Sequence, residues 1–154
     1  MKNNFILKCF LICFVVTADL LTKILFKDMY FSLIPGVIGI AWARELNYGA
    51  AYNLFEGYTP IIIIVSLILI VFIILYDIKN KPNSKLYSVG IGFVIGGAIG
   101  NLVDRIVLGG VRDFIIFEFW RDFPTFNVAD SFLVIGVILL VFYILIFAKE
   151  KESK

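Results

Sequence analysis

The sequence contains no histidine, and charged residues make up only 17% of its 154 positions. The absence of histidine excludes Ser-His-Asp and Cys-His catalysis, histidine-ligated metal sites and imidazole proton switching. The two cysteines, Cys9 and Cys13, give neither a disulfide framework nor a metal-binding pattern, so we expect them to pack as small apolar residues. A net charge of +2 without a block of basic residues argues against a nucleic-acid partner. Carboxylates are the remaining candidates for acid–base chemistry.

Hydrophobic residues make up 61% of the chain, and the mean hydropathy of +0.98 is far above that of a soluble domain. A helix that crosses a bilayer needs roughly 20 mostly apolar residues. Four segments meet this requirement, at about residues 5–25, 60–76, 86–103 and 129–148. The first leads into Asp19 and Lys23, not into a small-residue cleavage site, so it is not a removable signal peptide. We therefore predict one α-helical membrane domain over residues 1–154.

Four spans place both termini on the same side of the membrane, and the positions of the cations indicate which side. The cytoplasmic side of a membrane protein carries the excess of lysine and arginine, above all in short loops near the helix ends. Eight cations flank the side that holds the termini and six flank the other, so we expect both termini to be cytoplasmic. The eight are Lys2, Lys8, Lys79, Lys81, Lys85, Lys149, Lys151 and Lys154, and the six are Lys23, Lys27, Arg44, Arg105, Arg112 and Arg121.

Two segments on the outer side carry unusual patterns. Between residues 38 and 48, bulky residues such as Ile40 and Trp42 alternate with small ones such as Gly39 and Ala41, and this period of two predicts a short strand or hairpin. The small side of that strand leaves room for another group. In "DFIIFEFWRDFPTFN", aromatic residues mix with charges, which is typical of a segment that lies at the bilayer interface.

Asp19 and Lys23 lie one helical turn apart at the outer end of the first span. One interpretation is an ion pair in which the lysine side chain extends to the membrane interface. The alternative is a supporting role beside a functional site, because ionisable residues within a membrane usually face the interior of the helix bundle.

The third span combines glycines with polar residues. Gly92, Gly96 and Gly100 have the four-residue spacing that lets membrane helices approach closely. The next turn carries Asn101, Asp104 and Arg105. This spacing puts all three on one face of the helix. The residues alone favour a structural polar cluster over a catalytic Asp104.

Asp113 and Asp130 both border the outer aromatic segment. Gly109 and Gly110 allow a tight turn that redirects the chain before Asp113. Asp130 can be read as the acid of a capping box with Asn127 as the N-cap, and the residues alone favour this structural interpretation. The alternative is that the fold brings the two aspartates together. Two neighbouring carboxyl groups would share a proton, and one could then act as a base toward water while the other protonates a leaving group.

Five motifs occur in the order and spacing found in the lipoprotein signal peptidases, also called signal peptidase II: "ADLLTK", "LNYGAAY", "GGAIGNLVDR", "GGVRDF" and "FNVADS". The chain resembles this family over essentially its whole length. The resemblance implies an aspartic peptidase of the bacterial cytoplasmic membrane. Such an enzyme removes signal peptides from lipid-modified prolipoproteins by cleaving before the diacylglyceryl-cysteine, at an active site on the outer side. It also implies that no metal or other cofactor is used.

The resemblance implies roles for individual residues. The catalytic dyad of the family maps onto Asp113 and Asp130, while Leu20 and Tyr52 depart from the common pattern without touching that dyad. A small β-cradle is implied over about residues 29–57 and a lid over about residues 105–128. The expected partners are lipid-modified prolipoproteins and membrane lipid, and we expect a monomer. The supporting polar residues map onto Asp19, Lys23, Asn47, Asn101, Asp104, Arg105 and Asn127.

A small proton-coupled membrane transporter is the competing function, because membrane carboxylates can relay protons. Such transporters often carry inverted repeats and broken helices, and neither pattern is present in this sequence. The second span also has no ionisable residue between Ile61 and Tyr76. The polar residues gather at one side of the membrane and form no track across it.

Overall fold

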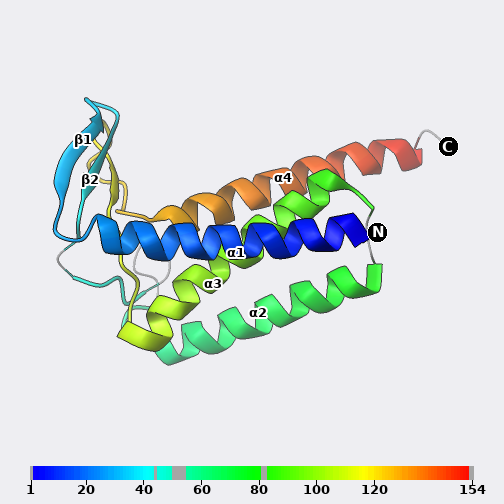
Figure 1. Ribbon diagram of the computed structural model, residues 1–154, viewed down its shortest axis with the longest axis horizontal. Coiled ribbons are helices and arrows are strands. Elements are labelled where there is room, and N and C mark those ends of the chain that lie inside the picture. Colours follow the sequence, from blue (N-terminus) through cyan, green and yellow to red (C-terminus); the bar gives the residue numbers. More distant parts are fainter. Residues whose placement is uncertain (1, 44, 50–54, 81–82, 153–154) are drawn as a thin grey trace.

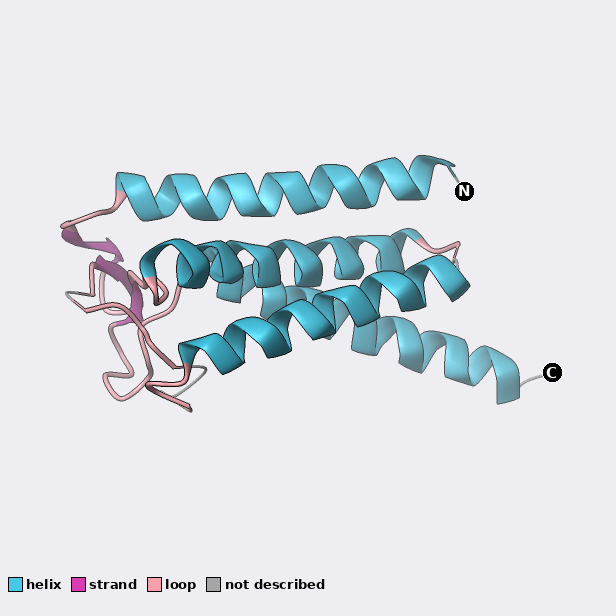
Figure 2. Cartoon of the chain, turned by 90° about the horizontal axis from the view of Figure 1, so that it is seen from below, coloured by secondary structure: helices cyan, strands magenta, loops and turns pink. Residues whose placement is uncertain are grey.

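The computed structural model describes residues 2–43, 45–49, 55–80 and 83–152. Four helices run along the molecule, with a small sheet at one end and both ends of the chain at the other (Figures 1 and 2). The helices are α1 (Lys2–Leu25), α2 (Thr59–Asn80), α3 (Lys85–Leu108) and α4 (Val128–Glu152). The strands are β1 (Tyr30–Ile34), β2 (Ile38–Ala41) and β3 (Ile115–Phe117).

All four helices are long and apolar enough to cross a membrane, which confirms the four predicted spans. The third span is longer than predicted, because α3 continues to Leu108. Asp104 and Arg105 therefore lie on the helix, and the outer loop starts after residue 108, not near residue 105. Part of the predicted cradle, residues 50–54, lies outside the described residues.

Helix α3 forms the centre of the bundle and packs against each of the other three helices. In its most apolar stretch, 67% of the residues are buried within the protein. The corresponding share is 6% to 11% in the other three helices. The remaining helix surfaces are apolar and exposed, as expected for surfaces that face lipid. The buried apolar cluster consists of Ile70, Tyr87, Ile91, Ile95 and Leu102.

The glycines of α3 bring α1 into close contact. A Cβ atom at Gly96 would lie 2.8 Å from Cβ of Val15, and one at Gly100 would lie 2.7 Å from Oδ2 of Asp19. A larger residue at either position would push the two helices apart. The predicted close approach is thus confirmed, and it places the Asp19 carboxylate directly against α3.

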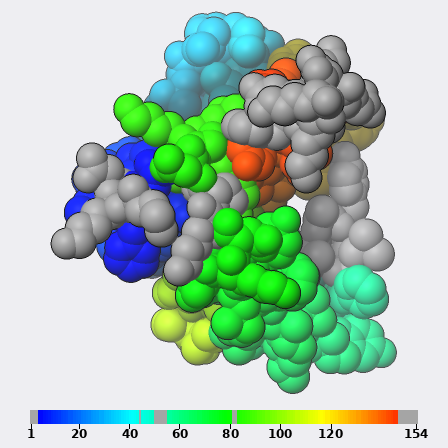
Figure 3. Space-filling view, turned by 90° about the vertical axis from the view of Figure 1, so that its right-hand side faces the viewer, coloured from blue at the N-terminus to red at the C-terminus, as the bar shows by residue number. Residues whose placement is uncertain are grey.

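Polar contacts join the helices at the end where the chain termini lie, which faces the viewer in Figure 3. Nζ of Lys8 on α1 lies 2.6 Å from Oδ1 of Asp77 on α2, and Nδ2 of Asn4 donates to Oδ1 of Asn83 over 3.1 Å. Within the described ranges, α1 and α2 make no close backbone contact. The Lys8–Asp77 pair therefore links two helices whose backbones do not approach each other closely.

The sheet has the antiparallel strand order β1-β2-β3. Of the described residues in the range 38–48, where alternation predicted a strand, those that form one are Ile38–Ala41. Strand β3 comes from the aromatic segment predicted to form the lid, so part of that segment is paired with the cradle. The small side of β2 is already occupied, because a Cβ atom at Gly39 would lie 2.6 Å from Oε1 of Glu118. Oε2 of Glu118 accepts a hydrogen bond from the N–H of Gly36, which ties the β1–β2 turn to the segment after β3.

Candidate active site

Asp130 lies in the first turn of α4, and Asn127 precedes that helix. The N–H of Asp130 donates to Oδ1 of Asn127 (2.9 Å), and the N–H of Asn127 donates to Oδ2 of Asp130 (3.2 Å). This reciprocal pair satisfies backbone donors that the start of a helix leaves free. The predicted capping box is confirmed, and it fixes the direction in which the Asp130 carboxyl group points.

Asp113 is held by backbone pairing with the segment that follows β2. The N–H of Ala43 donates to the Asp113 carbonyl (3.1 Å), and the N–H of Ala41 donates to the Phe114 carbonyl (2.8 Å). On the other side, the N–H of Phe114 donates to the Phe126 carbonyl (3.0 Å). The Asp113 main chain is therefore fixed by the sheet and its extension, and its side chain is only 4% exposed.

The two glycines before Asp113 have separate roles. Gly109 ends α3 in the left-handed region (φ 81°), and its N–H donates to the carbonyl of Arg105. That conformation favours glycine. Gly110 allows close approach, because a Cβ atom there would lie 2.8 Å from Cβ of Leu46. The predicted turn at these two glycines is confirmed.

Three asparagines hold the aspartates in one cluster. Nδ2 of Asn127 donates to Oδ1 of Asp113 (2.7 Å), while its backbone N–H contacts Asp130. Nδ2 of Asn101 on α3 donates to Oδ1 of Asp130 (2.7 Å). Nδ2 of Asn47 donates to Oδ2 of Asp113 (3.0 Å). Among the described residues, each of the four carboxylate oxygens thus accepts one hydrogen bond.

Lys23 is the centre of a second group of contacts behind the aspartates. Its Nζ atom lies 2.7 Å from Oδ2 of Asp19 and 3.2 Å from Oδ2 of Asp104, and it donates to Oδ1 of Asn101 (3.3 Å). The Lys23 side chain is 0% exposed, so the interpretation in which it extends to the interface is wrong. Oδ1 of Asp19 accepts from the N–H of Ala129 (2.9 Å), which ties α1 to the start of α4.

Arg105 extends from the last turn of α3 toward the segment after β2. Its Nη2 atom donates to the Gly49 carbonyl (2.8 Å), and its buried Nε atom has no hydrogen-bond partner in the part of the chain that the structure describes. The structure therefore gathers every predicted site residue into one region at the sheet end of the bundle: Asp19, Lys23, Asn47, Asn101, Asp104, Arg105, Asp113, Asn127 and Asp130.

Arg112 is the polar residue of this region that we did not predict. Its guanidinium group makes two hydrogen bonds to the Asp104 carboxylate, at 2.6 and 3.1 Å. The pair is eight residues apart and spans the turn at Gly109 and Gly110, so neither helical nor strand periodicity indicates the contact. The sequence gives one indication of this contact, which is that Asp104 and Arg112 carry opposite charges on either side of Gly109 and Gly110.

Burial, and to a smaller extent the nearby charge of Asp130, together raise the pKa of Asp113 to about 6, although hydrogen bonds from Asn47 and Asn127 oppose the shift. A carboxyl group with such a pKa can hold or release a proton near neutral pH. Two carboxyl groups that share one asparagine can therefore divide the roles of acid and base. Among the described residues, no group of three or more His, Cys, Asp and Glu side chains is placed to hold a metal ion.

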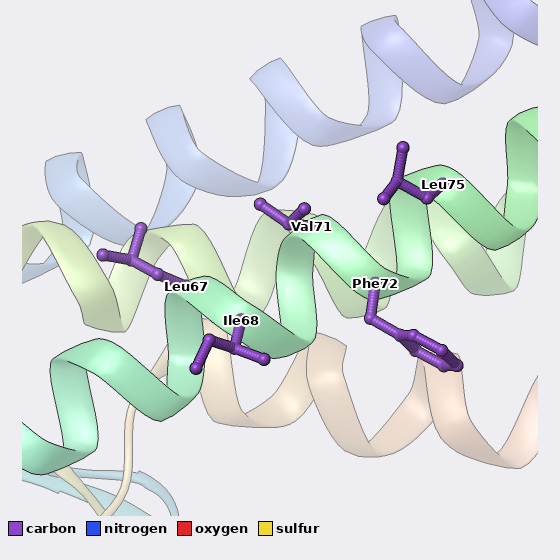
Figure 4. A pocket seen from close by; sticks show the side chains of 5 residues that line it. All are labelled: Leu67, Ile68, Val71, Phe72 and Leu75. Atoms are coloured by element: carbon purple, nitrogen blue, oxygen red, sulfur yellow. The ribbon is translucent and has the colours of Figure 1, made fainter.

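An apolar groove of about 380 Å³ lies elsewhere, on the surface of α2 (Figure 4). All its lining side chains are hydrocarbon and come from α2, so it offers no acid, base or hydrogen-bond donor. The lining residues are Leu67, Ile68, Val71, Phe72 and Leu75. The chemistry belongs to the polar cluster at the sheet end.

Comparisons with known proteins agree with one another. A family model described as signal peptidase (SPase) II matches residues 11–146. A lipoprotein signal peptidase of Enterococcus faecalis is 45% identical over 122 residues, which cover 79% of this chain and 74% of that protein. One from Staphylococcus aureus (strain JH9) is 36% identical over 92% of this chain and 89% of that protein. A solved structure of a bacterial membrane enzyme has a TM-score of 0.82 at 33% identity, covering 96% of this chain and 90% of that one.

The raised pKa of Asp113 gives a testable prediction. Asp130→Asn removes a neighbouring negative charge, so the pKa of Asp113 should fall below about 6. It should stay above the ordinary value of 3.8, because burial is the larger cause of the shift. Infrared difference spectra of the carboxyl bands across a pH titration would measure this, with the Asp113 band assigned by its loss in Asp113→Asn. An unchanged pKa in Asp130→Asn would show that the two groups do not interact.

Proposed function

The chain belongs to the signal peptidase II family, and on this premise we propose that Asp113 and Asp130 are its catalytic dyad. It is a multi-pass bacterial membrane protein and an aspartic endopeptidase. Its reaction removes the signal peptide from diacylglyceryl-modified prolipoproteins by cleaving before the lipidated cysteine. No observation favours the transporter alternative. The single observation that most supports the dyad is that Asn127 contacts both carboxyl groups.

The proposed mechanism is direct hydrolysis by a pair of carboxyl groups that share one proton. The ionised carboxylate takes a proton from a water molecule, and the water oxygen attacks the carbonyl carbon of the scissile peptide bond. The protonated partner gives its proton to the amine nitrogen as that bond breaks. The burial of Asp113 supports this division, because a desolvated carboxyl group keeps its proton more readily.

The supporting residues have positioning roles in this proposal. Asn127, Asn101 and Asn47 hold the oxygen atoms of the dyad through their side-chain amides. Lys23 and Asp19 fix Asn101 and the start of α4 from behind. Asp104 balances the charge of Lys23. Arg105 lies close enough to act electrostatically on both aspartates.

Helix α3 ends and α4 begins at the end of the bundle opposite the two termini (Figure 1), and the dyad residues lie in the segment after α3 and in the first turn of α4. With the termini in the cytoplasm, as the lysine distribution indicates, this end faces the outer side of the cytoplasmic membrane. A substrate anchored in the bilayer by its diacylglyceryl group would then present its scissile bond at the depth of the dyad. We propose that the enzyme works as a monomer on lipid-modified prolipoproteins, in contact with membrane lipid, without a cofactor and without a nucleic-acid partner.

The segment 114–126 is proposed as a lid with one fixed part and one movable part. Its first residues form β3 and pair with β2, so they are fixed to the sheet. Beyond β3, Phe119 and Trp120 are 65% and 50% exposed. Such aromatic side chains are suited to the membrane interface, and the turn that carries them could lift to admit a bulky lipidated peptide.

Substitution of either aspartate tests the dyad. Asp113→Asn or Asp130→Asn should reduce cleavage of a lipidated prolipoprotein by at least about 100-fold, because asparagine keeps the shape but cannot transfer the proton. The assay uses purified protein in detergent, with thermal unfolding as the check on folding. Asp28→Asn is the matched control, since Asp28 is exposed and asparagine tolerates its positive φ of 59°. If Asp130→Asn kept its turnover and only lowered thermal stability, Asp130 would be a capping residue and nothing more.

Hydrogen exchange tests the lid. The amides of residues 119–123 and 125 should exchange faster than those of α2 in the free enzyme, and they should become protected when a substrate-mimicking inhibitor binds. The amides of Phe114 and Ile115 donate to the Phe126 carbonyl and serve as an internal reference that should stay slow. Exchange at 119–123 and 125 as slow as in α2, or protection that the inhibitor leaves unchanged, would make this segment a fixed interfacial anchor.

A further inference from the structure

Arg112 is adjacent to Asp113 in sequence, yet the dyad mechanism gives it no task. It directs three donors at Asp104: Nη2 to Oδ1 (2.6 Å), Nε to Oδ2 (3.1 Å) and its backbone N–H to Oδ2 (3.0 Å). The Asp104 side chain is 1% exposed, whereas that of Arg112 is 20% exposed. Arg112 therefore supplies the buried carboxylate with a bidentate cation from the rim of the site.

Asp104 has a second cation within reach. Nζ of Lys23 lies 3.2 Å from Oδ2 of Asp104, and it also contacts Asp19 and Asn101. Asp19, Lys23, Asp104 and Arg112 thus form a row of alternating charges whose sum is zero. Buried charges are stable only when they are paired, so the loss of one member changes how the others share their contacts.

The contacts of Lys23 differ in length. It is 2.7 Å from Asp19, 3.2 Å from Asp104 and 3.3 Å from Oδ1 of Asn101. Without the guanidinium group, Asp104 would keep Lys23 as its one ion-pair partner among the described residues. The ammonium group would then move toward Asp104, and its longest contact, the one to the neutral Asn101, would be lost first.

Asn101 is the residue through which this displacement would reach the dyad. Its Oδ1 atom accepts from Lys23 and from Nδ2 of Asn127, and these contacts leave its Nδ2 atom to donate to Asp130 (2.7 Å). An amide has one donor end and one acceptor end, so the contacts to Oδ1 decide which end faces the carboxylate. If the contact with Lys23 is lost, Oδ1 of Asn101 keeps only its hydrogen bond from Nδ2 of Asn127 among these two contacts.

We propose that Arg112 is a positioning residue for catalysis: it satisfies Asp104, which leaves Lys23 on Asn101 and keeps the Asn101 amide donating to Asp130. This inference rests on the proposed assignment of the dyad. The Arg112 side chain does not contact the dyad directly in this proposal. Its effect reaches Asp130 through the side chains of Asp104, Lys23 and Asn101. A purely structural role, in which Arg112 only braces the turn at Gly109 and Gly110, is the alternative that the experiment must separate.

The charge balance provides that separation. Arg112→Met leaves the row of charges at −1, Asp104→Asn leaves it at +1, and the double variant returns it to zero. We expect kcat to fall roughly tenfold in Arg112→Met with little change in KM, the effect of about one weakened hydrogen bond to a charged group. Arg112→Met/Asp104→Asn should recover to within roughly threefold of the wild-type kcat. Lys27→Met, which removes an exposed cation from the same end of the molecule, is the matched control and should leave kcat unchanged.

If kcat of the double variant is as low as that of Arg112→Met, or lower, the proposal is overturned and Arg112 braces the turn. A wild-type kcat in Arg112→Met would also overturn the proposal. If Arg112→Met fails to fold, Arg112→Lys decides: a lysine keeps the charge, so kcat should stay near wild type, and a tenfold loss would overturn the proposal. Asp113→Asn and Asp130→Asn, assayed alongside, separate this inference from the assignment of the dyad. If Asp113→Asn or Asp130→Asn remains active, the assignment of the dyad is refuted. If both are inactive and Arg112→Met has the wild-type kcat, only the proposed role of Arg112 is refuted.

Discussion

The structure depends on how a helix bundle with an apolar surface accommodates buried charge. Lys23 has no exposed surface, and it is stable there because the Asp19 and Asp104 carboxylates surround it. Asp19 in turn accepts the N–H of Ala129, so this ion pair joins α1 to the start of α4. The close approach at Gly100 makes the arrangement possible, because any side chain there would meet the Asp19 carboxylate. Helix packing and charge pairing therefore require each other.

The same network determines where the two aspartates of the proposed dyad lie. Asn101 connects Lys23 to Asp130, and Asn127 connects Asp130 to Asp113. Asp113 reaches this point from a different direction, because its main chain is paired with the extension of the sheet. One carboxyl group is thus fixed by a helix start and the other by a sheet. Such independent supports suit a site that must keep two acids close together at the edge of a membrane.

Local patterns in the sequence were sufficient to predict the spans, the close packing at Gly96 and Gly100, and the capping box of Asn127 with Asp130, since each depends on residues near one another in the chain or on one helix face. The burial of Lys23 was one of two interpretations that the sequence left open, and its contacts with Asp104 and Asn101 could not be predicted because those residues come from another helix. The Arg112–Asp104 pair crosses a turn whose geometry no periodicity describes. Strand β3 was assigned wholly to the lid, because an aromatic, charged segment gives no indication that it pairs with residues about 75 positions earlier.

We propose that a buried dyad on the outer side of the cytoplasmic membrane cleaves peptides whose lipid anchor holds the scissile bond at the depth of the dyad. The most direct test gives purified wild-type protein a prolipoprotein in diacylglyceryl-modified and unmodified forms, and it identifies the products by mass spectrometry. The account predicts a single cut immediately before the modified cysteine and much slower cleavage of the unmodified form. Equal cleavage of both forms, or a cut at another bond, would contradict it.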